Sequence, residues 1–212
     1  MKNNISQILK ILAIDYPDAK TALIHKNALE MLIATILSAQ CTDERVNIVT
    51  KSLFKKYKTP EDYANVNIKE LEQDIRSTGF YKNKANNIKN CCKMIIETYN
   101  GKVPDTLDSL IKLPGVGRKT ANVVLGAVFN KVEGIVVDTH VRRLSYRLGL
   151  TKNKNPEKIE QDLIKIIPKK DWIFISNSLI LHGRKVCNAR LPLCSICHLN
   201  KICLRNGVLK SK

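Results

Sequence analysis

The sequence has few acidic residues and no long apolar run. It carries 19 Asp and Glu residues against 36 Lys and Arg, so its formal net charge is +17. No stretch approaches the roughly 20 apolar residues that span a membrane, so we expect no membrane protein. The first residues, MKNNISQILKILAIDYP, space their apolar side chains helically, and no small-residue cleavage site follows them. We therefore expect no secretory signal and a cytoplasmic protein.

The sequence also has no low-complexity tract, no long linker and no evident repeat. Its 212 residues allow one large domain or two small ones. Apolar side chains recur with helical spacing almost everywhere, and only residues 134–137 look like a strand, for which no partner strand is present. These patterns predict an all-α protein.

The excess of basic residues indicates a polyanionic partner, most simply DNA or RNA. An anionic membrane surface is a competing interpretation. A general bias toward lysine is another, because Ile, Lys and Asn are all abundant. Charge alone does not choose among them.

Seven cysteines without a secretion signal favour a metal site in a reducing compartment over a disulfide framework. Four of them cluster near the C-terminus, namely Cys187, Cys194, Cys197 and Cys203. Only Cys194 and Cys197 form a CxxC pair, and this asymmetry favours an iron–sulfur cluster while leaving zinc open. His182 and His198 could replace a thiolate, although four cysteines already complete the ligand set. The remaining cysteines, at positions 41, 91 and 92, are expected to be buried and apolar.

The segment LPGVGRKTANVV, from Leu113 to Val124, predicts a tight turn between two helices. Asp105 or Thr106 can cap a short first helix, and the second is expected to begin near Arg118. Gly115 and Gly117 permit positive φ and a close backbone approach. Free amides at the start of the second helix could bind a DNA phosphate, as in a helix–hairpin–helix. An ordinary turn between helices is the alternative.

Lys119 and Asp138 are the candidates for chemistry. Lys119 follows the turn and could contact phosphate or act as a nucleophile. Asp138, in VDTH, could be a helix N-cap, a role compatible with catalysis because a cap fixes the carboxylate. The arginines that follow it, Arg142, Arg143 and Arg147, are expected on a solvated or phosphate-facing surface.

Two further residues lie where a loop could enter a duplex. Gln40 lies between two helical stripes, and Phe80 follows a predicted helix end. Taken singly, Gln40 is better explained as a polar loop residue and Phe80 as a core aromatic.

Taken together, these motifs resemble the endonuclease III family of iron–sulfur DNA glycosylases and AP lyases. LSAQCTD, GFYKNKA, LPGVGRKTANVV, VDTH, LILHGR and the cysteine spacing occur in the family's order, from about residue 5 to residue 206. The resemblance implies a six-helix domain over residues 21–131, with the helix–hairpin–helix at about 106–129. It implies a second domain from residues 1–20 and 132–212, which holds a [4Fe-4S] cluster on the loop 187–203.

The resemblance also implies an activity, which is removal of oxidised pyrimidines from damaged duplex DNA followed by strand cleavage through a lysine Schiff base. Lys119 would be the nucleophile and Asp138 the catalytic carboxylate. Gln40 and Phe80 would fill the gap left by a flipped nucleotide, although many relatives have Leu where this chain has Phe80. The DNA contacts would include Gly115, Gly117, Arg118, Arg184 and Arg190. We expect a monomer that works on nucleoid DNA of a bacterial type of cell.

Three alternatives remain at this point. Adenine-mismatch glycosylases share the cluster but lack the lysine at position 119. Uracil or thymine mismatch glycosylases are closer. A DNA-binding regulator with a metal sensor would explain the charge and cysteines but would not need both Lys119 and Asp138.

Overall fold

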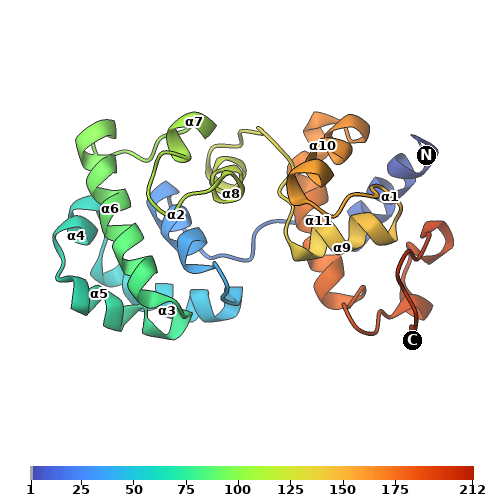
Figure 1. The fold of residues 1–212 in the computed structure, drawn as a ribbon, viewed down its shortest axis with the longest axis horizontal. Helices are drawn as coiled ribbons and strands as arrows, with labels where there is room; N and C mark the ends of the chain where they lie inside the picture. Colours follow the sequence, from blue (N-terminus) through green and yellow to red (C-terminus); the bar gives the residue numbers. More distant parts are fainter. Residues whose placement is uncertain (1) are drawn as a thin grey trace. The chain divides into compact units, whose positions relative to one another are not determined.

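The protein folds into two compact helical units. The computed structural model describes residues 2–212, with side chains from residue 4 onward. The central unit comprises residues 21–133, and the terminal unit combines the described part of residues 1–20 with residues 134–212 (Figure 1). The described residues contain helices and no β-strand, which confirms the predicted all-α class.

The central unit is built around one buried helix. Residues 31–37 of α2 are all buried, and α2 packs against α3, α6 and α8. Its helices are α2 (Ala28–Leu37), α3 (Asp43–Lys56), α4 (Pro60–Asn65), α5 (Ile68–Asp74), the 3-10 helix η1 (Arg76–Thr78), α6 (Tyr81–Tyr99), α7 (Leu107–Leu110) and α8 (Arg118–Val128). Six of these α-helices have at least six residues, and α7 is a single turn.

Local sequence signals set several of these helix ends. Thr59 caps α4 in a reciprocal capping box with Asp62, and Pro60 occupies the first turn, where its missing N–H is not needed. The longest helix of the unit, α6, ends at Tyr99. Its C-cap, Asn100, adopts a left-handed conformation with φ 52°. Both boundaries are therefore set by residues at the helix ends themselves.

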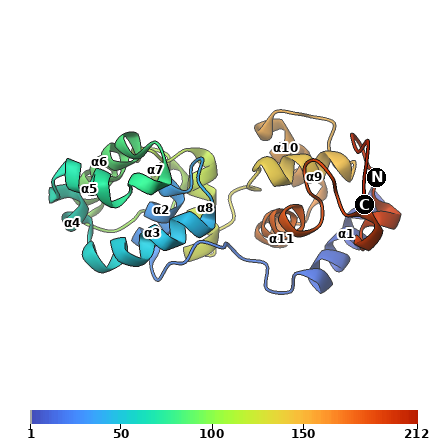
Figure 2. The same ribbon diagram turned by 90° about the horizontal axis from the view of Figure 1, so that it is seen from below.

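The terminal unit joins the two ends of the chain in one core. Its helices are α1 (Lys2–Asp15), α9 (Thr139–Arg147), α10 (Pro156–Ile166), α11 (Trp172–Lys185) and the 3-10 helices η2 (Lys169–Asp171), η3 (Cys194–Ile196) and η4 (Asn200–Ile202). Helix α11 packs against α9 and α1, and α10 packs on α9 (Figure 2). Ile8 and Leu12 of α1 are fully buried in the same core as Leu144 and Leu179. The helical spacing at the N-terminus therefore reflects real burial.

Residues 134–137 form an extended connection that leads into α9. Ile135 is 1% exposed and belongs to the core of the terminal unit. Burial explains the apolar run without a strand. No helix in the described part of the chain is long and apolar enough to cross a bilayer.

Candidate active site and metal centre

The turn between α7 and α8 presents backbone amides at a helix start. Thr106 caps α7 by accepting a hydrogen bond from the Ser109 amide at 3.3 Å, and α8 begins at Arg118, as the sequence predicts. Gly117 is the N-cap of α8 with φ −86° and has no side chain to bond the first amides. A helix that starts in this way carries partial positive charge and can accept an anion.

Gly115 allows this turn to lie close to α6. Its φ is +78°, and a Cβ built on it would lie 2.8 Å from the Cβ of Asn87. Only glycine meets both demands. Leu113 and Val116 on either side are buried in the central core, so the turn is anchored to the folded unit.

Lys119 is the second residue of α8, next to the amides of the turn. Both Arg118 and Lys119 are exposed. The Lys119 amine is therefore hydrated in the free protein. The hairpin therefore offers an anion site and a primary amine side by side.

Asp138 is the N-cap of α9 in the terminal unit, which confirms that part of the prediction. Its Oδ1 accepts a hydrogen bond from the Val141 amide at 2.8 Å, and its side chain is half-buried. The bond holds the carboxylate in one orientation. One turn along, His140 Nδ1 accepts from Arg143 Nη2 at 3.2 Å, and burial lowers the pKa of His140.

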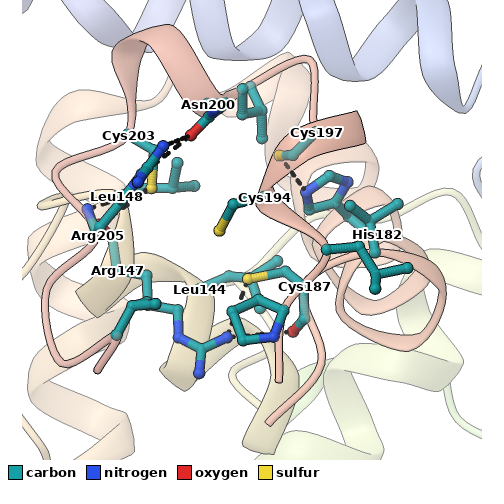
Figure 3. Close-up of a pocket in the computed structure, with 15 residues that line it drawn as sticks. Leu144, Arg147, Leu148, His182, Cys187, Cys194, Cys197, Asn200, Cys203 and Arg205 are labelled. Atoms are coloured by element: carbon teal, nitrogen blue, oxygen red, sulfur yellow. Dashed lines mark hydrogen bonds between the residues drawn. The ribbon is translucent and has the colours of Figure 1, made fainter. Parts of the chain in front are cut away.

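The four C-terminal cysteines line one cavity. Its empty volume is about 420 Å³ including the open mouth, and its walls are mostly apolar, with Leu144, Leu148 and Leu199 among them. Figure 3 shows the four sulfur-bearing side chains around this common space. All four are half-buried free thiols that come from the end of α11, from η3 and from the residue after η4.

Polar hydrogens point at several of these sulfurs. Arg147 Nη1 donates to Cys187 Sγ at 3.1 Å, and the Arg205 amide donates to Cys203 Sγ at 3.4 Å. Burial raises the pKa of the Cys197 thiol to about 11, so without a metal it stays protonated. A bound metal would reverse this by stabilising the thiolate.

The donor set fits a polynuclear cluster. Among the described residues, no three side chains of His, Cys, Asp or Glu converge closely enough to hold a single metal ion. The thiols surround a volume instead of a point, and N–H donors to sulfur with apolar walls are compatible with an iron–sulfur cluster.

Two of the three arginines that follow Asp138 are not on the expected surface. Arg147 is only 6% exposed and donates to the carbonyls of Asn188 and Ala189 at 2.7 and 2.9 Å. Arg143 is half-buried and donates to the carbonyl of Cys187. The prediction is correct for Arg142, which is exposed, and wrong for Arg147. Positions i and i+4 share a helix face, so Arg143 and Arg147 together turn toward the cysteine loop.

The two histidines near the cysteines have different partners. His182 is 2% exposed, with Nδ1 3.1 Å from Tyr16 Oη and Nε2 3.4 Å from Cys197 Sγ. Burial lowers its pKa to about 4. His198 is exposed, and its Nδ1 lies within hydrogen-bond distance, 2.6 Å, of Asp15 Oδ1. His182 thus contacts both α1's neighbour Tyr16 and the sulfur of Cys197, while His198 connects the cysteine loop to α1.

Gln40 and Phe80 are exposed and lie on two loops of the central unit. Both have left-handed backbones, with φ 54° and 48°, which non-glycine residues adopt rarely. Phe80 is 63% exposed, so it is not a core aromatic. Cys91 and Cys92 are buried as predicted, at 1% exposure each, whereas Cys41 is only half-buried.

Arg184 and Arg190 flank the start of the cysteine loop. Arg184 lies in the last turn of α11, and Arg190 lies on the loop between Cys187 and Cys194. Both are exposed.

A family model described as "HhH-GPD superfamily base excision DNA repair protein" matches residues 33–169. The chain is 50% identical to endonuclease III of Synechocystis sp. over 95% of its length and 92% of that protein. It belongs to the endonuclease III family. Endonuclease III of Bacillus subtilis is also 50% identical, over 93% of this chain and 90% of that protein.

Solved structures of endonuclease III share the fold. A non-covalent endonuclease III–DNA complex matches with a TM-score of 0.91 and 51% identity over 96% of this chain and 95% of that one. A trapped endonuclease III–DNA covalent intermediate gives the same values. A thermostable thymine-DNA glycosylase matches with a TM-score of 0.81 and 26% identity over 95% of this chain and 94% of that one.

Membership in the endonuclease III family decides between the classes of protein left open by the sequence. The chain is a base-excision repair enzyme, and a regulator without catalytic activity is excluded. A DNA partner agrees with the net charge of +17.

Proposed function

We propose that this chain removes oxidised pyrimidines from duplex DNA, with Lys119 as the nucleophile, and then cleaves the strand by β-elimination. Membership in the endonuclease III family makes it a DNA glycosylase and AP lyase. The observation that carries the assignment of Lys119 is its place beside the hairpin amides. An anion site that holds a DNA phosphate there would bring a deoxyribose within reach of the amine.

The reaction needs the amine and a carboxylate. Neutral Lys119 attacks C1′ of an extruded nucleotide, the glycosidic bond breaks, and the base leaves with the electron pair and takes up a proton. The first proton released by the amine nitrogen balances the one that the base takes up. The C1′–O4′ bond then breaks, O4′ takes up the second amine proton as the sugar ring opens, and an imine between Nζ and C1′ remains. Loss of a C2′ proton then breaks the C3′–O bond and nicks the strand. Asp138 would stabilise the positive charge that develops on the sugar, from the orientation fixed by its bond to Val141.

The DNA contacts follow from the same arrangement. Gly115, Gly117 and Arg118 would bind phosphate at the hairpin, while Gln40 and Phe80 would occupy the space that the extruded nucleotide leaves. Arg184 and Arg190 would contact phosphates from the terminal unit. We place the protein in the cytoplasm, acting as a monomer on nucleoid DNA.

The cysteine cavity would hold a [4Fe-4S] cluster on Cys187, Cys194, Cys197 and Cys203. The bound cluster supplies four metal–sulfur bonds that cross-link the loop 187–203. Arg147 and Arg205 donate hydrogen bonds to its ligand sulfurs, and Arg147 also binds the loop carbonyls. Anaerobically purified protein should contain about four irons and four sulfides per chain. Stoichiometric zinc without sulfide would exclude the cluster.

Borohydride trapping tests the chemistry, because an amine that attacks the sugar must pass through an imine. Wild-type protein should give a covalent adduct with thymine glycol or abasic duplexes. Lys119→Gln should abolish trapping and nicking while largely preserving binding. Asp138→Asn keeps a good N-cap but should slow base removal by about 10²–10³-fold.

Lys112→Gln is the matched control, since Lys112 is an exposed lysine just before the same turn. It should trap like the wild type. Trapping that persists in Lys119→Gln would place the nucleophile elsewhere. Base loss without trapping in the wild type would indicate a monofunctional glycosylase, the activity type of mismatch enzymes.

A further inference from the structure

Two loops of the central unit carry exposed residues in a strained conformation. Gln40 lies three residues after the end of α2, and Phe80 lies two residues after the end of η1. Both have φ near +50° although neither is glycine. Such strain persists only where the surrounding structure holds it, and it is common at functional sites.

One buried side chain joins the two loops at their bases. Lys84 is 4% exposed, and its Nζ donates to the carbonyl of Leu37 at 2.8 Å and to the carbonyl of Thr78 at 2.8 Å. Leu37 ends α2, and Thr78 ends η1. The Lys84 amide also donates to the Phe80 carbonyl at 3.1 Å. Lys84 therefore contacts the bases of both loops, and it hydrogen-bonds the backbone both just before Phe80 and at Phe80 itself.

An ammonium at this place is costly to bury. Desolvation lowers the pKa of Lys84, and the partners of its Nζ are carbonyls and not a carboxylate. The two carbonyls lie at helix ends, where they have no intrahelical donor and carry partial negative charge. An apolar side chain would fill the space but could not join these two carbonyls.

We propose that Lys84 is a positioning residue that fixes the separation of the Gln40 and Phe80 loops, so that both side chains enter the duplex together. This inference rests on the proposed DNA contacts of Gln40 and Phe80. Paired bases leave the stack only if the gap is filled as it opens, and two wedges held in place carry a smaller entropic penalty than two mobile ones.

The test compares two duplexes under single-turnover conditions. Thymine glycol lies opposite adenine in one. In the other it lies opposite a reduced abasic analogue that cannot form an imine, so extrusion there breaks no base pair and leaves no orphan base. Lys84→Met should slow excision about tenfold or more from the paired duplex and less than about twofold from the unpaired one. Melting curves of each variant verify that it is folded.

Lys89→Met is the matched control. Lys89 lies on the same helix, and its Nζ also donates to a backbone carbonyl, that of Val66, which belongs to neither loop. It should match the wild type on both duplexes. If Lys84→Met does not fold, Lys84→Gln, which keeps a donor for one carbonyl, should show the same selective loss.

Parallel variants separate this inference from the proposed contacts. If Gln40→Ala and Phe80→Ala lose paired-duplex activity while Lys84→Met does not, Lys84 has no positioning role. Equal losses on both duplexes would make Lys84 merely structural. If neither loop variant is selective, the proposed contacts fail and the inference fails with them. Lys84→Met added to the Gln40→Ala/Phe80→Ala double variant should cost little more than that double variant alone, because Lys84 acts through these two side chains.

Discussion

His182 connects the N-terminal helix to the cysteine loop through its two ring nitrogens. Tyr16 Oη lies 3.1 Å from Nδ1, and Cys197 Sγ lies 3.4 Å from Nε2. In the cluster-loaded protein proposed above, Cys197 would be a thiolate with no proton to donate, so Nε2 would carry the hydrogen. In a neutral ring Nδ1 is then an acceptor, and the Tyr16 hydroxyl must donate. Burial raises the pKa of Tyr16 to about 12, so it keeps its proton at every pH near neutral.

Tyr16→Phe should therefore destabilise the protein. The substitution removes the hydroxyl and leaves Nδ1 of a buried ring without its donor, which costs about 1–3 kcal/mol. Urea unfolding of the metal-loaded protein measures the difference. Tyr146→Phe is the control, because Tyr146 is 41% exposed and should change stability little. Equal stabilities of the two variants would show that the hydroxyl does not support His182.

At the scale of elements, the two glycines of the hairpin between α7 and α8 differ in whether the fold can accept a side chain at their positions. Gly115 combines φ +78° with a Cβ position 2.8 Å from Asn87, whereas Gly117 has φ −86° and nothing within 4 Å of its Cβ position. Gly115→Ala should therefore lower stability by roughly 1–2 kcal/mol from the left-handed backbone alone, with the clash in addition. Gly117→Ala should fold like the wild type.

The DNA affinity of Gly117→Ala then tests binding separately from folding. Because the protein accommodates a Cβ at position 117, a weaker affinity of Gly117→Ala for undamaged duplex would report the close approach of a phosphate. Thermal melting and fluorescence anisotropy measure the two quantities on the same samples. Unchanged affinity in a folded Gly117→Ala would argue against the hairpin as a DNA grip.

The same elements show why some features are predictable from sequence and others are not. The capped start of α4 at Thr59, the start of α8 at Arg118 and the N-cap Asp138 depend on neighbours within four residues, so local patterns suffice. The buried roles of Arg147 and Lys84 each depend on a carbonyl more than 40 residues away in sequence, that of Asn188 for Arg147 and that of Leu37 for Lys84. Nothing local distinguishes these side chains from solvated ones. The spacing and order of the motifs are enough to single out the four cysteines as a group. The hydrogen-bond partners of their sulfurs become visible only in the structure.

At the scale of the whole molecule, the dominant property is the net charge of +17. A duplex carries condensed counterions, and each phosphate that the protein neutralises releases some of them. The charge is therefore a source of affinity that does not depend on base sequence. An exposed basic residue with no part in catalysis can therefore still contribute to DNA affinity.

Binding to undamaged duplex should consequently weaken steeply with salt. The slope of log affinity against log salt should be near −0.9 for each phosphate neutralised. Replacing Arg184 or Arg190 with Gln should make the slope shallower by about one each, if these exposed residues contact phosphate. Lys10→Gln, at an exposed lysine of α1 outside the proposed contacts, should leave the slope unchanged. Anisotropy titrations between low and physiological salt measure all four proteins. A flat response in the wild type would mean that the basic residues are a compositional bias, because counterion release is unavoidable wherever lysine and arginine side chains neutralise the phosphates of a duplex.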